Sequence, residues 1–269
     1  MPELTCEVCH GLGFEIVEKD GREFARMCGC RTNSVGADDL VIACRIPRRY
    51  EHCNLGTFEP GNTSLRQALE KAMRYCAGYP FSGEDEGLGL LFSGGNGVGK
   101  THLAVAVLRE LVTSHGVRGR FWDFHELIRE IKSSYNAVTR TTEEQVLEPV
   151  ITAEVLILDD LGAERITEWM VDTLFYIINE RYLAKRVTII TTNFLDAGRE
   201  SVLAADELSR REFLVERIGG RLRSRLLEMC LVVRVDGPDF REIRQSGKRH
   251  AVLGHALDVA PQGQSGRER

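Results

Sequence analysis

One stretch decides the fold of this chain: Leu88-Gly89-Leu90-Leu91-Phe92-Ser93-Gly94-Gly95-Asn96-Gly97-Val98-Gly99-Lys100-Thr101. An apolar, strand-like run leads into a glycine-rich loop, and a helical run follows at once. The glycines let the backbone curl, so that its N–H groups converge on phosphate oxygens at the N-terminus of a helix. We therefore expect residues 94–101, with the adjoining His102, to bind a nucleotide. Lys100 would reach the β- and γ-phosphates, and the Thr101 hydroxyl would hold Mg²⁺.

Length and composition set the class of protein. At 269 residues, the chain is long enough for one large domain and a small one. Its formal net charge of −5 gives no overall attraction to DNA or to an anionic membrane, although a local basic face is not excluded. The first five residues lack the basic start of a signal peptide, and no window of 18 apolar residues exists. We expect a cytoplasmic protein with no membrane partner.

Strands and helices alternate from residue 88 onward, which predicts a three-layer α/β domain around a parallel sheet. The expected strands are 88–93, 120–124, 155–159, 187–192 and 231–235. The expected helices are 101–114, 125–135, 143–153, 168–183 and 207–228, the last with a break near Gly219. Four regions follow: a cysteine module at 1–35, a linker with lead-in helices at 36–86, the main domain at 87–245, and a partly disordered tail at 246–269.

Polar side chains end two of these strands. Asp159 and Asp160 follow the apolar run 155–158, and acids at the carboxyl edge of a parallel sheet stand where ligands bind. We expect Asp159 to hold Mg²⁺ and Asp160 to orient or deprotonate the attacking water. Asn193 ends the fourth strand, which should lie beside the first and third, and would bond the water or the γ-phosphate. The alternatives are a solvated acidic turn and an asparagine that only caps a turn.

Basic residues gather near the end of the domain. Arg221 and Arg225 are four residues apart, so they share one helix face. Such a face is ordinarily solvated. In an ATPase that works as an oligomer, it can instead deliver an arginine finger to the neighbouring subunit, which raises the rate by about 10³–10⁵.

These motifs, in this order, resemble the AAA+ ATPases of the DnaC/DnaI/IstB group, which are helicase loaders and transposition helpers. The similarity covers roughly residues 46–245, and the lead-in Ile46-Pro47-Arg48-Arg49-Tyr50 belongs to it. It implies a core sheet in the AAA+ order, a finger at Arg225 with Arg221 as second candidate, and a sensor-2-like role for Arg241. Two departures stand out: Asp159-Asp160 replaces the more usual Asp-Glu pair, which fits a slow, switch-like ATPase, and the tail is too short for a separate lid domain.

The N-terminal region carries two close cysteine pairs, Cys6 with Cys9 and Cys28 with Cys30, separated by a hairpin-like stretch around Asp20-Gly21. Four thiolates at such spacings make a closed tetrahedral zinc site, which replaces the core that so short a unit cannot build. Free thiols, a redox pair or a His10 ligand are the alternatives. The arrangement is similar to the zinc module of DnaI-like loaders, and that resemblance implies docking to the helicase.

Residues 129–140 mix basic, hydroxyl and aromatic groups. In the resembled family this region faces single-stranded DNA, and Lys132, Ser133 and Tyr135 would contact phosphates and stack a base. An ordinary amphipathic helix, with Ile128, Ile131 and Tyr135 packed inward, explains the pattern equally well.

Together these features predict an ATP-dependent loader that uses ATP, Mg²⁺ and Zn²⁺. Its expected partners are a hexameric replicative helicase, single-stranded DNA and further copies of itself. An IstB-like helper that acts on a transposase is the nearest alternative. A nucleotide-gated zinc adaptor without turnover and a small-molecule kinase are the others.

Overall fold

The structure is a computed structural model that describes residues 14–19, 22–27, 37–135, 142–163, 167–196 and 213–242. Strands β1 (Phe14–Lys19) and β2 (Arg22–Met27) form an antiparallel hairpin, as the stretch around Asp20-Gly21 predicts. The expected zinc ligands Cys6, Cys9, Cys28 and Cys30 and the tail 246–269 lie outside the described residues. In the parts of the chain just given, no helix is long and apolar enough to cross a membrane.

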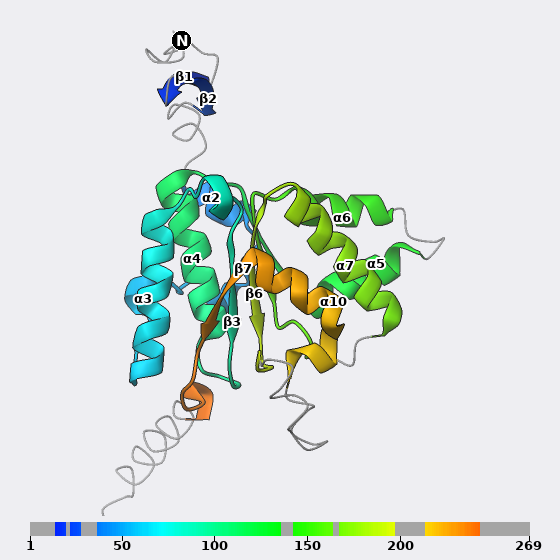
Figure 1. The fold of residues 1–269 in the computed structure, drawn as a ribbon. Helices are drawn as coiled ribbons and strands as arrows, with labels where there is room; N and C mark the ends of the chain where they lie inside the picture. Colours follow the sequence, from blue (N-terminus) through cyan, green and yellow to red (C-terminus); the bar gives the residue numbers. More distant parts are fainter. Residues whose placement is uncertain are drawn as a thin grey trace, which may run out of the picture.

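The main domain is built on a parallel five-stranded sheet in the order β4-β5-β6-β3-β7 (Figure 1). Its strands are β3 (Gly89–Ser93), β4 (Gly119–Asp123), β5 (Val155–Asp159), β6 (Val187–Thr192) and β7 (Cys230–Arg234). Every side chain of β3, β5 and β6 is buried, as expected for central strands covered on both faces. The fourth predicted strand, β6, does lie between the first and the third. This order brings the tips of β3, β6 and β5 together.

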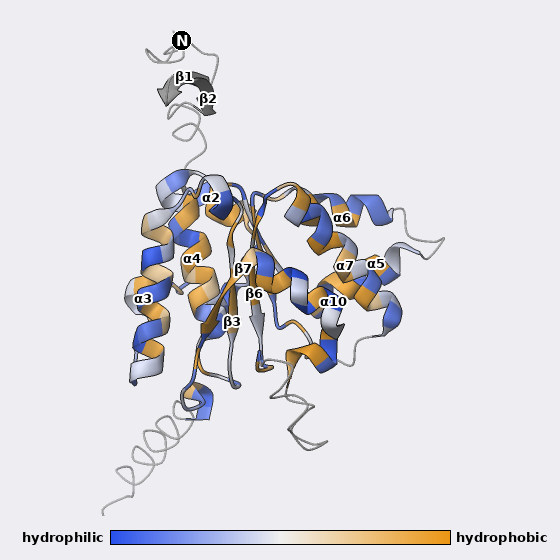
Figure 2. Ribbon diagram, in the orientation of Figure 1, coloured by the Kyte–Doolittle hydropathy of each residue, from blue (hydrophilic) through white to orange (hydrophobic). Residues whose placement is uncertain are grey.

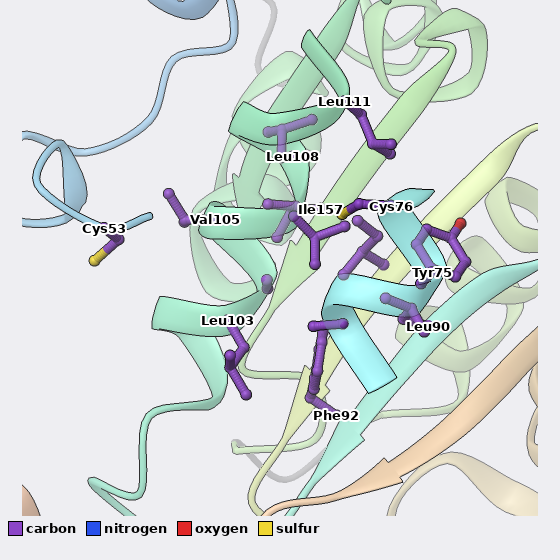
Figure 3. Packing of buried hydrophobic residues seen from close by; sticks show 14 of the residues in the cluster. Cys53, Tyr75, Cys76, Leu90, Phe92, Leu103, Val105, Leu108, Leu111 and Ile157 are labelled. Atoms are coloured by element: carbon purple, nitrogen blue, oxygen red, sulfur yellow. The ribbon is translucent and has the colours of Figure 1, made fainter. Parts of the chain in front are cut away.

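Helices cover both faces of the sheet and complete three layers (Figure 1). On one face lie α2 (Ala37–Ala43), α3 (Thr63–Gly78) and α4 (Lys100–His115). On the other lie α5 (Phe124–Ser134), α6 (Glu143–Thr152), α7 (Glu168–Leu183) and α10 (Leu214–Met229). Figure 2 shows the apolar stripes of these helices, and Figure 3 shows α3 and α4 packed on the strands. The three-layer α/β prediction is confirmed.

Local chemistry explains where these helices begin and break. Asn62, Thr142 and Thr167 each accept a hydrogen bond from a backbone N–H in the first turn of the helix that follows. The break expected in the last helix is present, because Gly219 has φ +77° and ψ +157° inside α10. Of the predicted helix 207–228, the residues before 213 lie outside the described ranges.

The segment that precedes the sheet packs on the main domain. It contains the short 3₁₀ turns η1 (Arg48–Tyr50), η2 (Leu55–Thr57) and η3 (Gly83–Asp85). Cys44 and Cys53 are buried in the same cluster as α4, and the Phe121 amide of β4 donates to the Cys44 carbonyl at 2.8 Å. The lead-in therefore belongs to the core and is held near the tips of the sheet.

Candidate nucleotide site

Lys100 stands at the start of α4, directly after the loop that leaves β3. Its side chain is buried, and its ammonium group donates to the Gly94 carbonyl at 3.0 Å, the Gly95 carbonyl at 2.5 Å and Asn193 Oδ1 at 2.7 Å. Burial lowers the pKa of Lys100 to about 8, while the nearby carboxylates Asp160 and Asp159 raise it. The positive charge is thus held under the loop, where a phosphate group would meet it.

Gly94 and Gly99 are two of the positions at which the backbone of the loop requires glycine. A Cβ on Gly94 would stand 1.9 Å from the Val235 carbonyl oxygen, which follows β7. Gly99 adopts φ +102°, a conformation that side chains avoid, and turns the chain into α4. Because nothing larger fits, the loop keeps the curled backbone that a phosphate cradle requires.

Asp159, at the end of β5, accepts hydrogen bonds from two hydroxyl groups. Thr101 Oγ1 donates to Asp159 Oδ1 at 2.9 Å, and Thr191 Oγ1 donates to the same oxygen at 2.6 Å. Asp159 is 5% exposed, and its burial raises the carboxyl pKa to about 6. Hydroxyl and carboxylate oxygens are the ligands that Mg²⁺ prefers, so this donor set fits the ion. Thr101 and Asp159 meet here as the sequence predicts, whereas Thr191 was identified only as part of the strand end.

Asp160 and Asn193 form a second link across the strand tips. Asn193 Nδ2 donates to Asp160 Oδ1 at 2.6 Å, while Asn193 Oδ1 accepts from Lys100. Asp160 has φ +59°, a left-handed conformation that Asp tolerates better than most residues, and its amide donates to Thr191 Oγ1 at 2.9 Å. Asn193 therefore contacts both the loop lysine and the second acid.

The segment after β7 closes over the loop. The Phe240 amide donates to the Gly97 carbonyl at 3.2 Å, and the Arg241 amide donates to Asp239 Oδ1 at 2.8 Å. The charge of Arg241 also acts on Lys100, whose pKa it lowers. The structure therefore brings Arg241, predicted from the resemblance, to the same end of the sheet.

Arg221 and Arg225, the two candidates for an arginine finger, lie on α10, away from the nucleotide site of their own chain. The Arg221 guanidinium lies 3.8 Å from the centre of the Phe175 ring, and the Arg225 guanidinium lies 3.9 Å from that of Tyr182. Arg225 also donates to Glu228 at 2.9 Å. Both arginines share one face of α10 and stack on α7, so within one chain they do not join Lys100 and Asp159.

His102 also points elsewhere. Its Nε2 lies 3.1 Å from the Asn54 carbonyl oxygen and 3.3 Å from Thr57 Oγ1, and its ring packs edge-on against Phe58. The predicted loop residue is therefore turned toward the lead-in segment.

Sequence reasoning did not include Tyr50 in the site. Burial and the nearby Asp159 carboxylate raise the pKa of the Tyr50 phenol, and the Tyr50 ring lies 6.2 Å from that of Phe121. With Asp159, both rings line a cleft of about 570 Å³. The resemblance includes the lead-in motif that contains Tyr50, but no spacing in the sequence indicates that Tyr50 lines the same cleft as Asp159.

The same cleft reaches the region expected to face DNA. Arg129 and Lys132 line it, while Ile128 and Ile131 are buried, as the amphipathic alternative predicts. Tyr135 is 55% exposed, so it is not packed inward as that alternative requires. Residues 136–140 lie outside the described part of the chain.

Comparisons with known proteins agree with this geometry. The family model described as IstB-like ATP binding protein matches residues 59–248. The chain is 26% identical over 232 residues to the phage-like element PBSX protein XkdC of Bacillus subtilis strain 168, and the match covers 84% of this chain and 79% of that protein.

Helicase loaders are among the similar proteins. The replicative helicase loader DnaI of Bacillus subtilis strain 168 is 29% identical over 157 residues, a match that covers 58% of this chain and about half (48%) of DnaI. A crystal structure of the DnaC helicase loader superposes with a TM-score of 0.59 and 36% identity, and covers 70% of this chain and 99% of that one.

Proposed function

The chain belongs to the IstB-like ATP-binding protein family, whose members are AAA+ ATPases, and from this premise we propose that it loads a replicative helicase onto single-stranded DNA. The observation that carries the proposal is the link from Lys100 through Asn193 to Asp160, beside the Thr101–Asp159 pair. Five polar side chains, from the ends of β5 and β6 and from the first turn of α4, lie close together, as ATP hydrolysis requires.

Each of these residues has a defined part in the proposed reaction. Lys100 neutralises the β- and γ-phosphates, and loop amides bind their oxygens. Thr101 and Asp159 would hold Mg²⁺, which supplies further charge neutralisation when bound. Asn193 positions the attacking water, and Asp160 accepts its proton. Lys100 donates a hydrogen bond to Asn193. When ATP binds, its phosphate would replace Asn193 as the partner of Lys100, and the position of Asn193 at the end of β6 would change.

Assembly would complete the site. We assign Arg225, with Arg221 as second candidate, to the γ-phosphate of a neighbouring subunit, and Arg241 to the phosphates bound in its own chain. The position of Arg225 on α10, away from its own loop, supports action between subunits.

The client is proposed from similarity and from surface charge. Proteins named as replicative helicase loaders are among the relatives, and Arg49, Arg129 and Lys132 along the cleft supply charges suited to a DNA backbone. We take residues 1–35 as the helicase-docking module, with Zn²⁺ held by its four cysteines. Residues 87–245 would form the ATPase domain, and 36–86 its lead-in.

Co-purification with the replicative helicase of the same organism tests the proposal. The full chain should retain the helicase in the presence of ATP, the chain lacking residues 1–35 should not, and both should bind ATP. Retention of a transposase instead of the helicase would identify an IstB-like helper. Equal helicase retention with and without residues 1–35 would remove the docking role of the cysteine module.

A further inference from the structure

We propose that His52, Cys53 and His102 form a binding site for a zinc-like divalent cation, outside the nucleotide site. Each residue offers one ligand atom, and the three atoms all lie within 4.8 Å of one another. His52 Nε2 and Cys53 Sγ lie 3.9 Å apart. Zinc bonds of about 2.0–2.3 Å at tetrahedral angles place ligand atoms ~3.3–3.8 Å apart, so a shift of about 1 Å completes the geometry.

The donor set decides the class of ion. One thiolate and two imidazole nitrogens select Zn²⁺ and similar borderline-soft cations, whereas Mg²⁺ prefers the oxygen ligands around Asp159. Three protein ligands leave a fourth position for water or for another group. The two metal sites are therefore chemically distinct, although His102 directly follows Thr101.

Hydrogen bonding around His102 supports the assignment. The Asn54 carbonyl can only accept, so the His102 Nε2 that lies 3.1 Å from it carries the proton and leaves the other ring nitrogen with its lone pair. Metal-ligating histidines generally make such a bond from the nitrogen that does not bind the metal. The edge-on contacts of the His102 ring with Phe58 and His52 restrict its rotation further.

The site joins two segments that are far apart in the sequence. His52 and Cys53 lie between η1 and η2, whereas His102 belongs to the first turn of α4. Figure 3 shows Cys53 on the lead-in segment beside α4, and its side chain is 2% exposed. A bound ion would therefore fix the lead-in against the helix that begins at Lys100. This role is additional to the proposed ATPase function and does not depend on it.

Metal content of the full chain tests the inference by difference, because the N-terminal cysteines are also expected to bind zinc. His52→Ala and Cys53→Ser are compared with His115→Ala, an exposed histidine, and Cys76→Ser, a buried cysteine of α3. After equilibration with Zn²⁺ and gel filtration, the two site variants should hold one zinc per chain fewer than the wild type and the controls.

Cobalt provides the second readout. Replacement of zinc by Co²⁺ should give thiolate-to-cobalt charge-transfer absorption, part of which is lost in Cys53→Ser but retained in Cys76→Ser. His52 is exposed, so His52→Ala should fold normally. If Cys53→Ser does not fold, the zinc content of His52→Ala alone tests whether the three residues bind the ion. Equal zinc content in His52→Ala and wild type, with an unchanged cobalt spectrum, would overturn the proposal.

Discussion

Asp159 shows how one buried carboxylate sets the electrostatics of the site. Burial is the largest cause of its raised pKa, and the two threonine hydroxyls only partly offset it. Between about pH 4 and pH 6, the folded protein without nucleotide therefore keeps a proton that the unfolded chain has lost. The folded state binds more protons in this window, so the contribution of Asp159 to stability falls as the pH rises through it.

Asp159→Asn should remove this dependence. In the absence of Mg²⁺-ATP and above pH 6, the unfolding free energy of the variant should exceed that of the wild type by about 1–3 kcal/mol. This difference should shrink toward pH 4. Urea unfolding of both proteins from pH 4 to pH 8 measures it. A difference that stays constant with pH would contradict the raised pKa. Added Mg²⁺-ATP should stabilise the wild type and not the variant.

We expect nucleotide affinity to depend most directly on Lys100. Lys100→Ala removes the charge under the loop and leaves the Gly94 and Gly95 carbonyls without their donor. We expect no measurable ATP binding by calorimetry. Lys71→Ala, which changes an exposed lysine of α3, should bind ATP like the wild type. ATP affinity in Lys100→Ala within a few-fold of the wild type would exclude this loop as the phosphate site.

At the scale of elements, the part of α10 that follows Gly219 places Arg221 and Arg225, four residues apart, against aromatic rings of α7. Arg217 lies before the break at Gly219, and its guanidinium lies 4.4 Å from the centre of the Phe194 ring, which is outside α7. Stacking on rigid rings limits the rotamers of these long side chains and so lowers the entropy lost when a finger engages. The helix therefore holds Arg225 in a defined position, as its proposed action on a neighbouring subunit requires.

Arg225→Ala tests the finger. Nucleotide binding should stay within a few-fold of wild type, while hydrolysis by the assembled protein should fall by about 10³-fold or more. Arg74→Ala, which removes an exposed arginine of α3, is the matched control. Phosphate release at saturating ATP and high protein concentration measures the effect. Normal turnover by the assembled Arg225→Ala protein would show that the finger lies elsewhere.

Arg181 links three elements, and its partners among the described residues are carbonyl and hydroxyl oxygens rather than carboxylates. Fully buried on α7, it donates to the Val150, Ile151 and Ala153 carbonyls at the end of α6 and to the Val187 carbonyl and Thr188 hydroxyl of β6. These bonds satisfy carbonyls that a helix end leaves unpaired. The arginine thus fixes α6 and α7 against β6, whose tip carries Asn193.

Arg181→Met keeps much of the volume but removes every donor. Because several buried carbonyls then lack partners, unfolding free energy should fall by about 3–5 kcal/mol. Chemical denaturation measures the loss, and Arg74→Met, at an exposed site, should change stability by less than about 0.5 kcal/mol. A loss in Arg181→Met as small as that of the control would mean that water replaces the missing donors.

At the scale of the whole molecule, the sequence predicts the sheet well and the contacts between distant segments poorly. β5, α7 and β6 begin and end at the predicted residues, because runs rich in apolar and β-branched residues and a threonine N-cap mark them locally. The contacts of Tyr50 with Phe121, of Phe240 with Gly97 and of His102 with Asn54 join segments far apart in the chain. No periodicity records such contacts, since they depend on how whole layers pack.

The sheet also separates two sets of buried side chains. Leu90 and Phe92 face the cluster under α3 and α4, whereas Leu91, between them, faces the cluster under α7 and α10. Because the strands stand between the clusters, a cavity opened on one side cannot be filled from the other. During evolution, a substitution that opens a cavity in one cluster should therefore be compensated by a second substitution in the same cluster. The losses in unfolding free energy caused by Leu103→Ala and Leu174→Ala should therefore add in the double variant. For two substitutions inside one cluster, the losses should not add.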